Sequence, residues 1–158
     1  GFAQVDRIGN INSTRFNNFI TGSGGAIDIS SAAKKLVFCG TFAVKGEQQI
    51  TADGLKVIHP GKAKKFVDRV EQVTFSGTSA IDRGQSVFYV TERAVFTLTP
   101  EGVMLLEVAP GLDLKTDVLD MMEFRPLISS ELKTIDAIIY RAEPLNLKEK
   151  FKEMKQRQ

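Results

Sequence analysis

The feature that most constrains the fold is the order of three short segments between residues 22 and 40. Gly22-Ser23-Gly24-Gly25 is followed by Ala26–Ala33, where alanine and polar residues surround two isoleucines, and then by the apolar run Leu36–Cys39. The glycines suit a tight turn, and the middle segment suits a short helix with Lys34 and Lys35 in its last turn. The apolar run is typical of a strand buried on both faces. A loop, a helix and a buried strand in this order predict an α/β layer.

The chain beyond Gly40 changes to hairpin patterns. Asp53-Gly54 lies at the centre of residues 49–58, and Thr99-Pro100-Glu101-Gly102 separates strand-like runs at 94–98 and 103–106. We also expect strands at Val70–Phe75 and Val87–Val90, and a short strand at Phe2–Ile8 that leads into a tight turn over residues 8–12.

Two helices are expected in the last third of the chain. Asp113 is a candidate cap for a helix over Leu114–Met122, which Arg125-Pro126 should end. The tail, about residues 145–157, predicts an amphipathic helix with Leu147, Phe151 and Met154 on one face. We expect residues 1–158 to form a single domain.

Composition excludes several classes of protein. The chain has 158 residues with 21 Lys+Arg against 19 Asp+Glu, and this weak charge bias argues against a dedicated nucleic-acid binder. Its apolar runs are too short to span a bilayer, so no membrane partner is expected. One cysteine and one histidine cannot form an internal disulfide or a Cys/His metal site, and the composition fits a cytoplasmic protein. Residue 1 is Gly and no leader follows, so we expect a boundary made by cloning or processing, with a missing upstream part.

Neither candidate for nucleophilic catalysis stands out. His59 follows a predicted hairpin strand, where a satisfied surface histidine is the favoured interpretation. Cys39 lies in an apolar strand, which favours an inert buried thiol, because reactive thiols need a polar, exposed setting.

The glycine segment and the lysines leave two interpretations open. Glycines before a helix allow a ligand to approach the backbone, so Gly22–Gly25 is either a plain loop or a site for an anion or a carbonyl. Lys45 follows the predicted buried strand, at the edge where ligands bind in α/β sheets, and is otherwise a solvated lysine. Lys62, Lys64 and Lys65 are most simply a solvated basic face, with a nucleotide phosphate contact as the minority interpretation.

Several of these segments together resemble the family I CoA-transferases. Gly22-Ser23-Gly24-Gly25-Ala26-Ile27-Asp28 is similar to the family's Gly-x-Gly-Gly-Ala-x-Asp segment, and Gly9-Asn10-Ile11-Asn12 to its upstream turn. Three later stretches, at residues 33–42, 90–96 and 107–113, also resemble family segments, especially in acetate/propionate CoA-transferases with both halves on one chain. The likeness runs from about Phe2 to about Arg141.

The resemblance implies a fold, a reaction and site residues. The fold would be a three-layer α/β/α domain with added β-hairpins. In the reaction, a glutamate takes CoA from an acyl-CoA as a glutamyl-CoA thioester and passes it to a short-chain carboxylate. CoA is a substrate, and no cofactor or metal is implied. Gly25 would donate its N–H to the oxyanion, Gly24 would allow the close approach, and Lys45 would contact CoA. A homo-oligomer is expected.

The family's nucleophile is missing from the sequence. It lies in a Glu-x-Gly context upstream of the glycine loop, whereas the first glutamate here is Glu47. We therefore expect a C-terminal portion of a transferase whose N-terminal half carries the nucleophile, and no catalytic residue in this chain. The alternatives are a non-catalytic ligand-sensing module or a structural module with the same fold.

Overall fold

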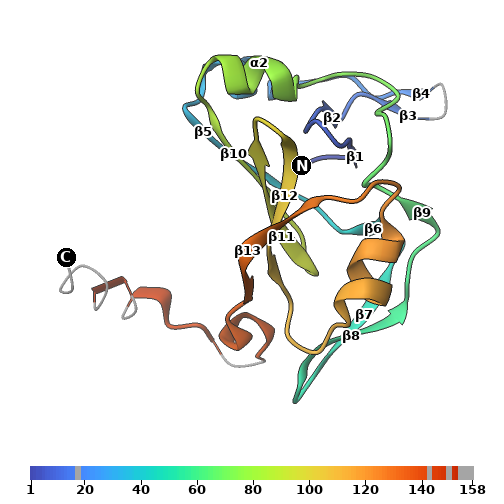
Figure 1. The fold of residues 1–158 in the computed structure, drawn as a ribbon, viewed down its shortest axis with the longest axis vertical. Helices are drawn as coiled ribbons and strands as arrows, with labels where there is room; N and C mark the ends of the chain where they lie inside the picture. Colours follow the sequence, from blue (N-terminus) through green and yellow to red (C-terminus); the bar gives the residue numbers. More distant parts are fainter. Residues whose placement is uncertain (17–18, 142–143, 149–150, 153–158) are drawn as a thin grey trace.

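A five-stranded mixed sheet forms the centre of the structure (Figure 1). The computed structural model describes residues 1–16, 19–141, 144–148 and 151–152. In spatial order the strands are β13 (Leu127–Thr134), β12 (Gly102–Val108), β11 (Ala94–Thr99), β10 (Ser86–Val90) and β5 (Lys35–Cys39). Helices accompany this mixed sheet, so the predicted α/β class is confirmed.

The connections explain which strands run parallel. β10, β11 and β12 follow each other through short turns and pair antiparallel. β5 and β10 pair parallel, and so do β12 and β13, because a long crossover separates the strands of each pair. The carboxyl ends of β5 and β10 therefore meet at one edge, where the N–H of Gly40 donates to the carbonyl of Val90 at 3.1 Å.

Short elements surround this sheet. The two-stranded pairs are β1 (Gln4–Val5) with β2 (Ile11–Asn12), β3 (Arg15–Phe16) with β4 (Phe19–Ile20), β6 (Ala43–Val44) with β9 (Ala63–Lys64), and β7 (Glu47–Thr51) with β8 (Gly54–His59). The helices are α1 (Ala26–Ala32), α2 (Gly77–Asp82), a π-helical turn η1 (Leu114–Val118), and the 3-10 turns η2 (Leu119–Met121) and η3 (Ala137–Tyr140). In Figure 1, α2 lies at one end of the sheet and the β7–β8 hairpin beyond the other.

The main core lies on one face of the sheet. Tyr89 and Phe96 point into it from β10 and β11, and the loop residue Phe66 packs on Phe96 with ring centroids 4.8 Å apart. The buried Tyr89 hydroxyl donates to the carbonyl of Gly9 at 2.7 Å. Gly9 has a φ of +79°, as expected for the tight turn there, and this bond fixes the turn against the sheet.

β5 is not buried on both faces, so that prediction is wrong. β5 forms an edge of the sheet, and only alternate residues face the core: Leu36 is buried, whereas Val37 is 54% exposed. Cys39 is also exposed, which contradicts the prediction that its thiol is buried. The apolar run indicated a strand, but it did not show that the described residues leave one face of that strand uncovered.

Other local predictions are corrected by the structure. Val70–Phe75 is not a strand; within it only Phe75 forms an isolated bridge, to Ile11. The strand expected at Phe2–Ile8 shortens to Gln4–Val5. Helix α1 ends at Ala32, so Lys34 and Lys35 lie outside it and Lys35 already begins β5.

Both predicted hairpins and one predicted helix cap are confirmed. β7–β8 turns through Ala52 and Asp53, one residue before the expected centre, and β11–β12 turns between Thr99 and Gly102. The Asp113 carboxylate accepts the N–H of Thr116 at 2.7 Å, although the helix that follows is a π turn and then a 3-10 turn. β13, α2, η3 and the short strands β2, β3, β4, β6 and β9 were not predicted, and the residues of β2 were expected to lie in the tight turn.

The expected tail helix is only partly described. Residues 147–148 and 151–152 are helical, and Leu147 and Phe151 are 52% and 59% exposed. Met154 and the rest of the expected helix lie outside the described residues.

Candidate functional site

The glycine loop is open to solvent. Gly22 and Gly24 have φ of +80° and +52°, a region that glycine tolerates best, and the loop closes where the N–H of Ala26 donates to Ser23 at 3.0 Å. Gly25, the N-cap of α1, has a φ of −85°. A β-carbon would meet nothing within 4 Å at Gly24, and only the Ile29 side chain, at 3.6 Å, at Gly25. A ligand therefore has room to approach this backbone.

Lys45 lies in the turn between β6 and β7. Its side chain is exposed, and its φ of +53° places a non-glycine residue in the left-handed region. The pairing of β6 with β9 holds the start of the turn, where the N–H of Lys62 donates to the carbonyl of Val44 at 2.7 Å. The turn follows β5 in the chain, as expected.

Within the described residues, no hydrogen bond joins Lys45 to the glycine loop. The last turn of α1 is attached to the start of β10, because the side-chain amide of Gln85 donates to the carbonyls of Ser30 and Ala33. Gly24 and Gly25 lie at the opposite end of that helix.

Sequence reasoning missed a polar cluster beside Lys45. The carboxylate of Glu92, which follows β10, accepts the backbone N–H of Phe42 at 2.9 Å and the side-chain amide of Gln48 at 2.8 Å. Phe42 and Gln48 lie on either side of the Lys45 turn. The available signal was the charged pair Glu92-Arg93, placed between two apolar strands at the carboxyl end of β10.

Arg93 is the largest fully buried side chain among the described residues. Its guanidinium donates to the carbonyls of Pro60 at 3.0 Å and Asp117 at 3.2 Å, and lies 5.2 Å from the ring centroid of Phe42. Its Nε has no hydrogen-bond partner among the described residues and lies 3.6 Å from the Glu92 carboxylate. Burial lowers the pKa of Arg93, and the neighbouring Glu92 partly opposes that shift.

The prediction of a solvated basic face at residues 62–65 is wrong for two of its three lysines. Lys65 is only 7% exposed; its ammonium lies over the ring of Phe2, 4.5 Å from the centroid, and 3.5 Å from the hydroxyl of Thr41. Burial lowers the pKa of Lys65. The ammonium of Lys64 donates to two carbonyls at the end of η2, whereas Lys62 is exposed.

His59 lies on the surface, as predicted. It is the last residue of β8, and its Nδ1 accepts the N–H of Gly61 at 3.1 Å. In the described part of the chain, no group of three or more His, Cys, Asp or Glu side chains could hold a metal ion. No helix there is long and apolar enough to cross a membrane.

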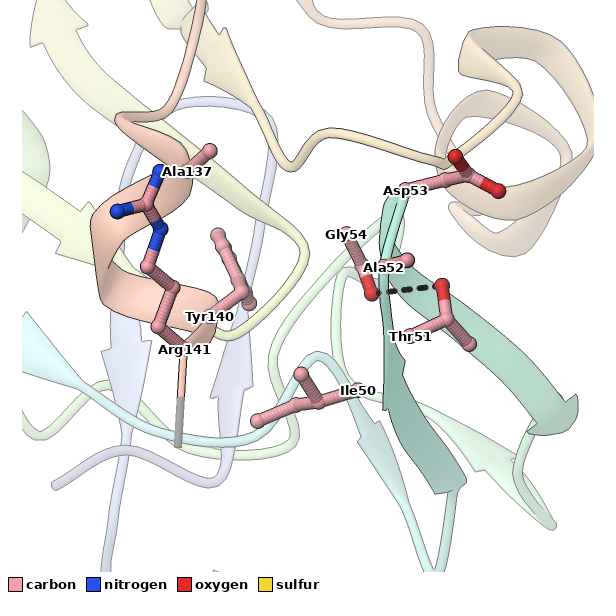
Figure 2. Close-up of a pocket in the computed structure, with 8 residues that line it drawn as sticks. All are labelled: Ile50, Thr51, Ala52, Asp53, Gly54, Ala137, Tyr140 and Arg141. Atoms are coloured by element: carbon pink, nitrogen blue, oxygen red, sulfur yellow. Dashed lines mark hydrogen bonds between the residues drawn. The ribbon is translucent and has the colours of Figure 1, made fainter. Parts of the chain in front are cut away.

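An open pocket of about 340 Å³ lies between the β7–β8 hairpin and η3 (Figure 2). Figure 2 shows Asp53 and Arg141 on opposite sides of it, and the Thr51 hydroxyl bonded to the Gly54 carbonyl within the hairpin turn. Neither the glycine loop nor Lys45 lines this pocket. It therefore does not unite the predicted site residues.

Comparison with known proteins finds similarity to CoA-transferases. No family model matches the sequence. The chain is 48% identical over 140 residues to an acetate CoA-transferase, YdiF, of Escherichia coli O157:H7, and 43% identical over 145 residues to a caffeate CoA-transferase of Acetobacterium woodii. A crystal structure of YdiF in a thioester complex with CoA superposes with a TM-score of 0.88 at 46% identity. Over most of its length the chain is similar to CoA-transferases.

The match covers most of this chain but only part of each relative. It includes 88% of the chain and 26% of the acetate CoA-transferase, and 89% of the chain and 28% of the caffeate CoA-transferase. The superposition covers 91% of the chain and 28% of the YdiF chain. The chain therefore spans about a quarter of the length of the relatives it matches.

Proposed function

We propose that this chain is the C-terminal portion of a cytoplasmic short-chain acyl-CoA:carboxylate CoA-transferase. The supporting observation is its 48% identity to an acetate CoA-transferase, together with its superposition on a solved CoA thioester complex. The nucleophilic glutamate would lie in the N-terminal half, outside these 158 residues, and the complete enzyme would be a homo-oligomer. One relative is named for acetate and another for caffeate. We therefore propose that the N-terminal half determines which carboxylate accepts CoA.

The glycine loop would serve the acyl-CoA carbonyl. Each half-reaction passes through an oxyanion, and a backbone N–H aimed at that oxygen stabilises the transition state. We assign this role to Gly25, with Gly24 giving the close approach. The open space around both residues supports the assignment, because a β-carbon at either position would meet no atom of the described residues within 4 Å except the Ile29 side chain.

Lys45 would bind the CoA moiety and not the acyl group. Its exposed ammonium is a flexible point charge, which suits a phosphate or the polar oxygens of pantetheine. It follows β5, near the edge at which the carboxyl ends of β5 and β10 meet and where ligands gather in α/β sheets.

The test of Lys45 is made on the full-length transferase. Lys45→Ala should weaken binding of acetyl-CoA and of free CoA by similar factors, more at low salt than at high salt, as measured by titration calorimetry. Lys56→Ala is the matched control, since Lys56 is also an exposed lysine, on the neighbouring strand β8. Unchanged affinities in Lys45→Ala would show a solvated lysine, and a loss for acetyl-CoA alone would place Lys45 at the reacting carbonyl.

The test of the glycine loop is Gly25→Val in the same enzyme. The backbone at Gly25 suits any residue, and a β-carbon has room, so the variant should fold normally. Its side chain would occupy the space meant for the thioester, and turnover should fall roughly 100- to 1,000-fold, the usual loss for one oxyanion donor. Normal turnover in the folded variant would reject the oxyanion role.

A further inference from the structure

Glu92 connects the two ends of the segment that carries Lys45. One carboxylate oxygen, Oε2, accepts the N–H of Phe42 at 2.9 Å, and the other, Oε1, accepts from the Gln48 side-chain amide at 2.8 Å. The chain between these contacts contains β6, the Lys45 turn and the start of β7. A single carboxylate therefore closes this segment into a loop with both ends fixed.

The buried guanidinium of Arg93 packs against the same turn. Its Nη2 donates to the carbonyl of Pro60 at 3.0 Å, and a β-carbon at Gly46 would lie only 3.2 Å from that nitrogen. The absence of a side chain at Gly46 thus lets the guanidinium pack against the turn. The Arg93 Nε lies 3.6 Å from the Glu92 carboxylate, so the two charges stabilise each other beside the turn.

The turn itself needs this support. A non-glycine residue in the left-handed region costs roughly 1–3 kcal/mol and persists only where its surroundings enforce it. Lys45 has such a backbone, with a φ of +53°, while its side chain remains exposed. Glu92 is well placed to enforce it, because its side chain is 26% exposed and both of its oxygens are bonded within the segment.

We propose that Glu92 is a positioning residue: its carboxylate holds the Lys45 turn in the conformation that binds CoA. The proposal rests on the function proposed above for Lys45. Glu92 does not react and does not contact substrate; it lowers the cost of ordering Lys45 on binding, as preorganised sites do.

The experiment is a double-mutant cycle in the full-length transferase, with Lys45→Ala, Glu92→Gln and the double variant. A glutamine keeps the size of Glu92 but offers one carbonyl acceptor, and its amide nitrogen faces a donor. We expect Glu92→Gln to weaken the binding of free CoA roughly 3- to 10-fold and to raise the KM for acyl-CoA by a similar factor. This is the usual effect of one lost hydrogen bond. The kcat and the KM for the acceptor carboxylate should change little. In the Lys45→Ala background, Glu92→Gln should cause no further loss.

Two further variants keep the proposal testable if Glu92→Gln proves unstable. Gln48→Met removes one bond to the Glu92 carboxylate at a half-buried position and should reproduce the weaker CoA binding. Glu101→Gln, in the exposed turn between β11 and β12, controls for the loss of a negative charge and should change nothing.

The outcomes separate the two proposals. An unchanged CoA affinity in folded Glu92→Gln and Gln48→Met would overturn the positioning role while leaving Lys45 as a CoA contact. An equal loss from Glu92→Gln with and without Lys45 would also overturn it, because Glu92 would then act independently of Lys45. If Lys45→Ala itself leaves the affinity for CoA unchanged, the CoA-binding role of Lys45 is refuted, and the positioning role of Glu92 is refuted with it.

Discussion

Removing the Tyr89 hydroxyl tests how the N-terminal turn is held on the sheet. Tyr89 is fully buried, and its hydroxyl donates to the buried carbonyl of Gly9 at 2.7 Å. In Tyr89→Phe the ring still fills the core, but the Gly9 carbonyl loses this donor. An unsatisfied buried acceptor costs about 1–3 kcal/mol, so we expect a loss near 2 kcal/mol in the free energy of unfolding.

Thermal unfolding at neutral pH measures this loss. For a chain of this length, about 2 kcal/mol corresponds to a decrease in Tm of roughly 4–8 °C. Tyr140→Phe is the matched control: its hydroxyl also donates to a carbonyl, that of Glu92 at 2.8 Å, but at a part-buried site that water can reach. We expect a loss of about 0.5–1 kcal/mol for that variant.

The difference in stability between the wild-type chain and Tyr89→Phe should also depend on pH, and this dependence can refute the reasoning. Burial raises the pKa of Tyr89 above its ordinary value of 10, and it raises the pKa of Tyr140 to about 12. A raised tyrosine pKa gives stability that is complete below the unfolded-state pKa and is lost as pH rises above it. The gap between the wild-type chain and Tyr89→Phe should therefore narrow above about pH 10. A constant gap from pH 7 to pH 11 would show that Tyr89 ionises freely in the folded chain.

Four further outcomes are expected, three of them from named contacts. Lys65→Met should raise Tm at neutral pH, because burial lowers the pKa of Lys65 and its charged form destabilises the fold. The increase in Tm should shrink as pH rises towards 10.5. A lower Tm in Lys65→Met at neutral pH would contradict this prediction. Ser76→Ala, which removes the cap on the Ser79 N–H, should cost about 1 kcal/mol in urea unfolding, and no change would refute the cap. Hydrogen bonds from Thr116 lower the pKa of Asp113, so Asp113→Asn should be less stable than wild type above pH 3.8. This difference in stability should disappear as pH falls through the lowered pKa. A difference that persists in acid would show that the charge of Asp113 is not its cause. The isolated chain should not transfer CoA from acetyl-CoA to a second carboxylate. A burst of protein–CoA thioester would contradict the expectation that the nucleophile lies outside this chain.

Hairpins were the part of the fold that the sequence predicted best. Asp53-Gly54 and the Thr99–Gly102 turn act locally, through residues that accept the backbone angles a reversal requires. Burial was harder to predict. The run at Leu36–Cys39 is a strand, but whether Val37 and Cys39 are covered depends on which segments pack against β5, and periodicity carries no information on that.

The candidate site divides in the same way. Gly24 and Lys45 were selected from local sequence, and each occupies an exposed turn with positive φ. The Glu92–Arg93 cluster was missed because its contacts to Phe42 and Pro60 span distant parts of the chain. Lys65 was misjudged for a related reason: beside Lys62 and Lys64 it reads as one more surface cation, whereas the fold places it against Phe2.

The parallel pairing of β5 with β10 has a consequence for synthesis on the ribosome. The hairpins β7–β8 and β11–β12 can close within microseconds of emerging, because each needs only its own turn. β5 must wait until the whole of residues 40–85 has been translated before β10 exists to pair with it. At ordinary translation rates this delay lasts about 2–10 s. During that time β5 lacks this partner strand, and its apolar side chains and Cys39 are available to chaperones and to other nascent chains.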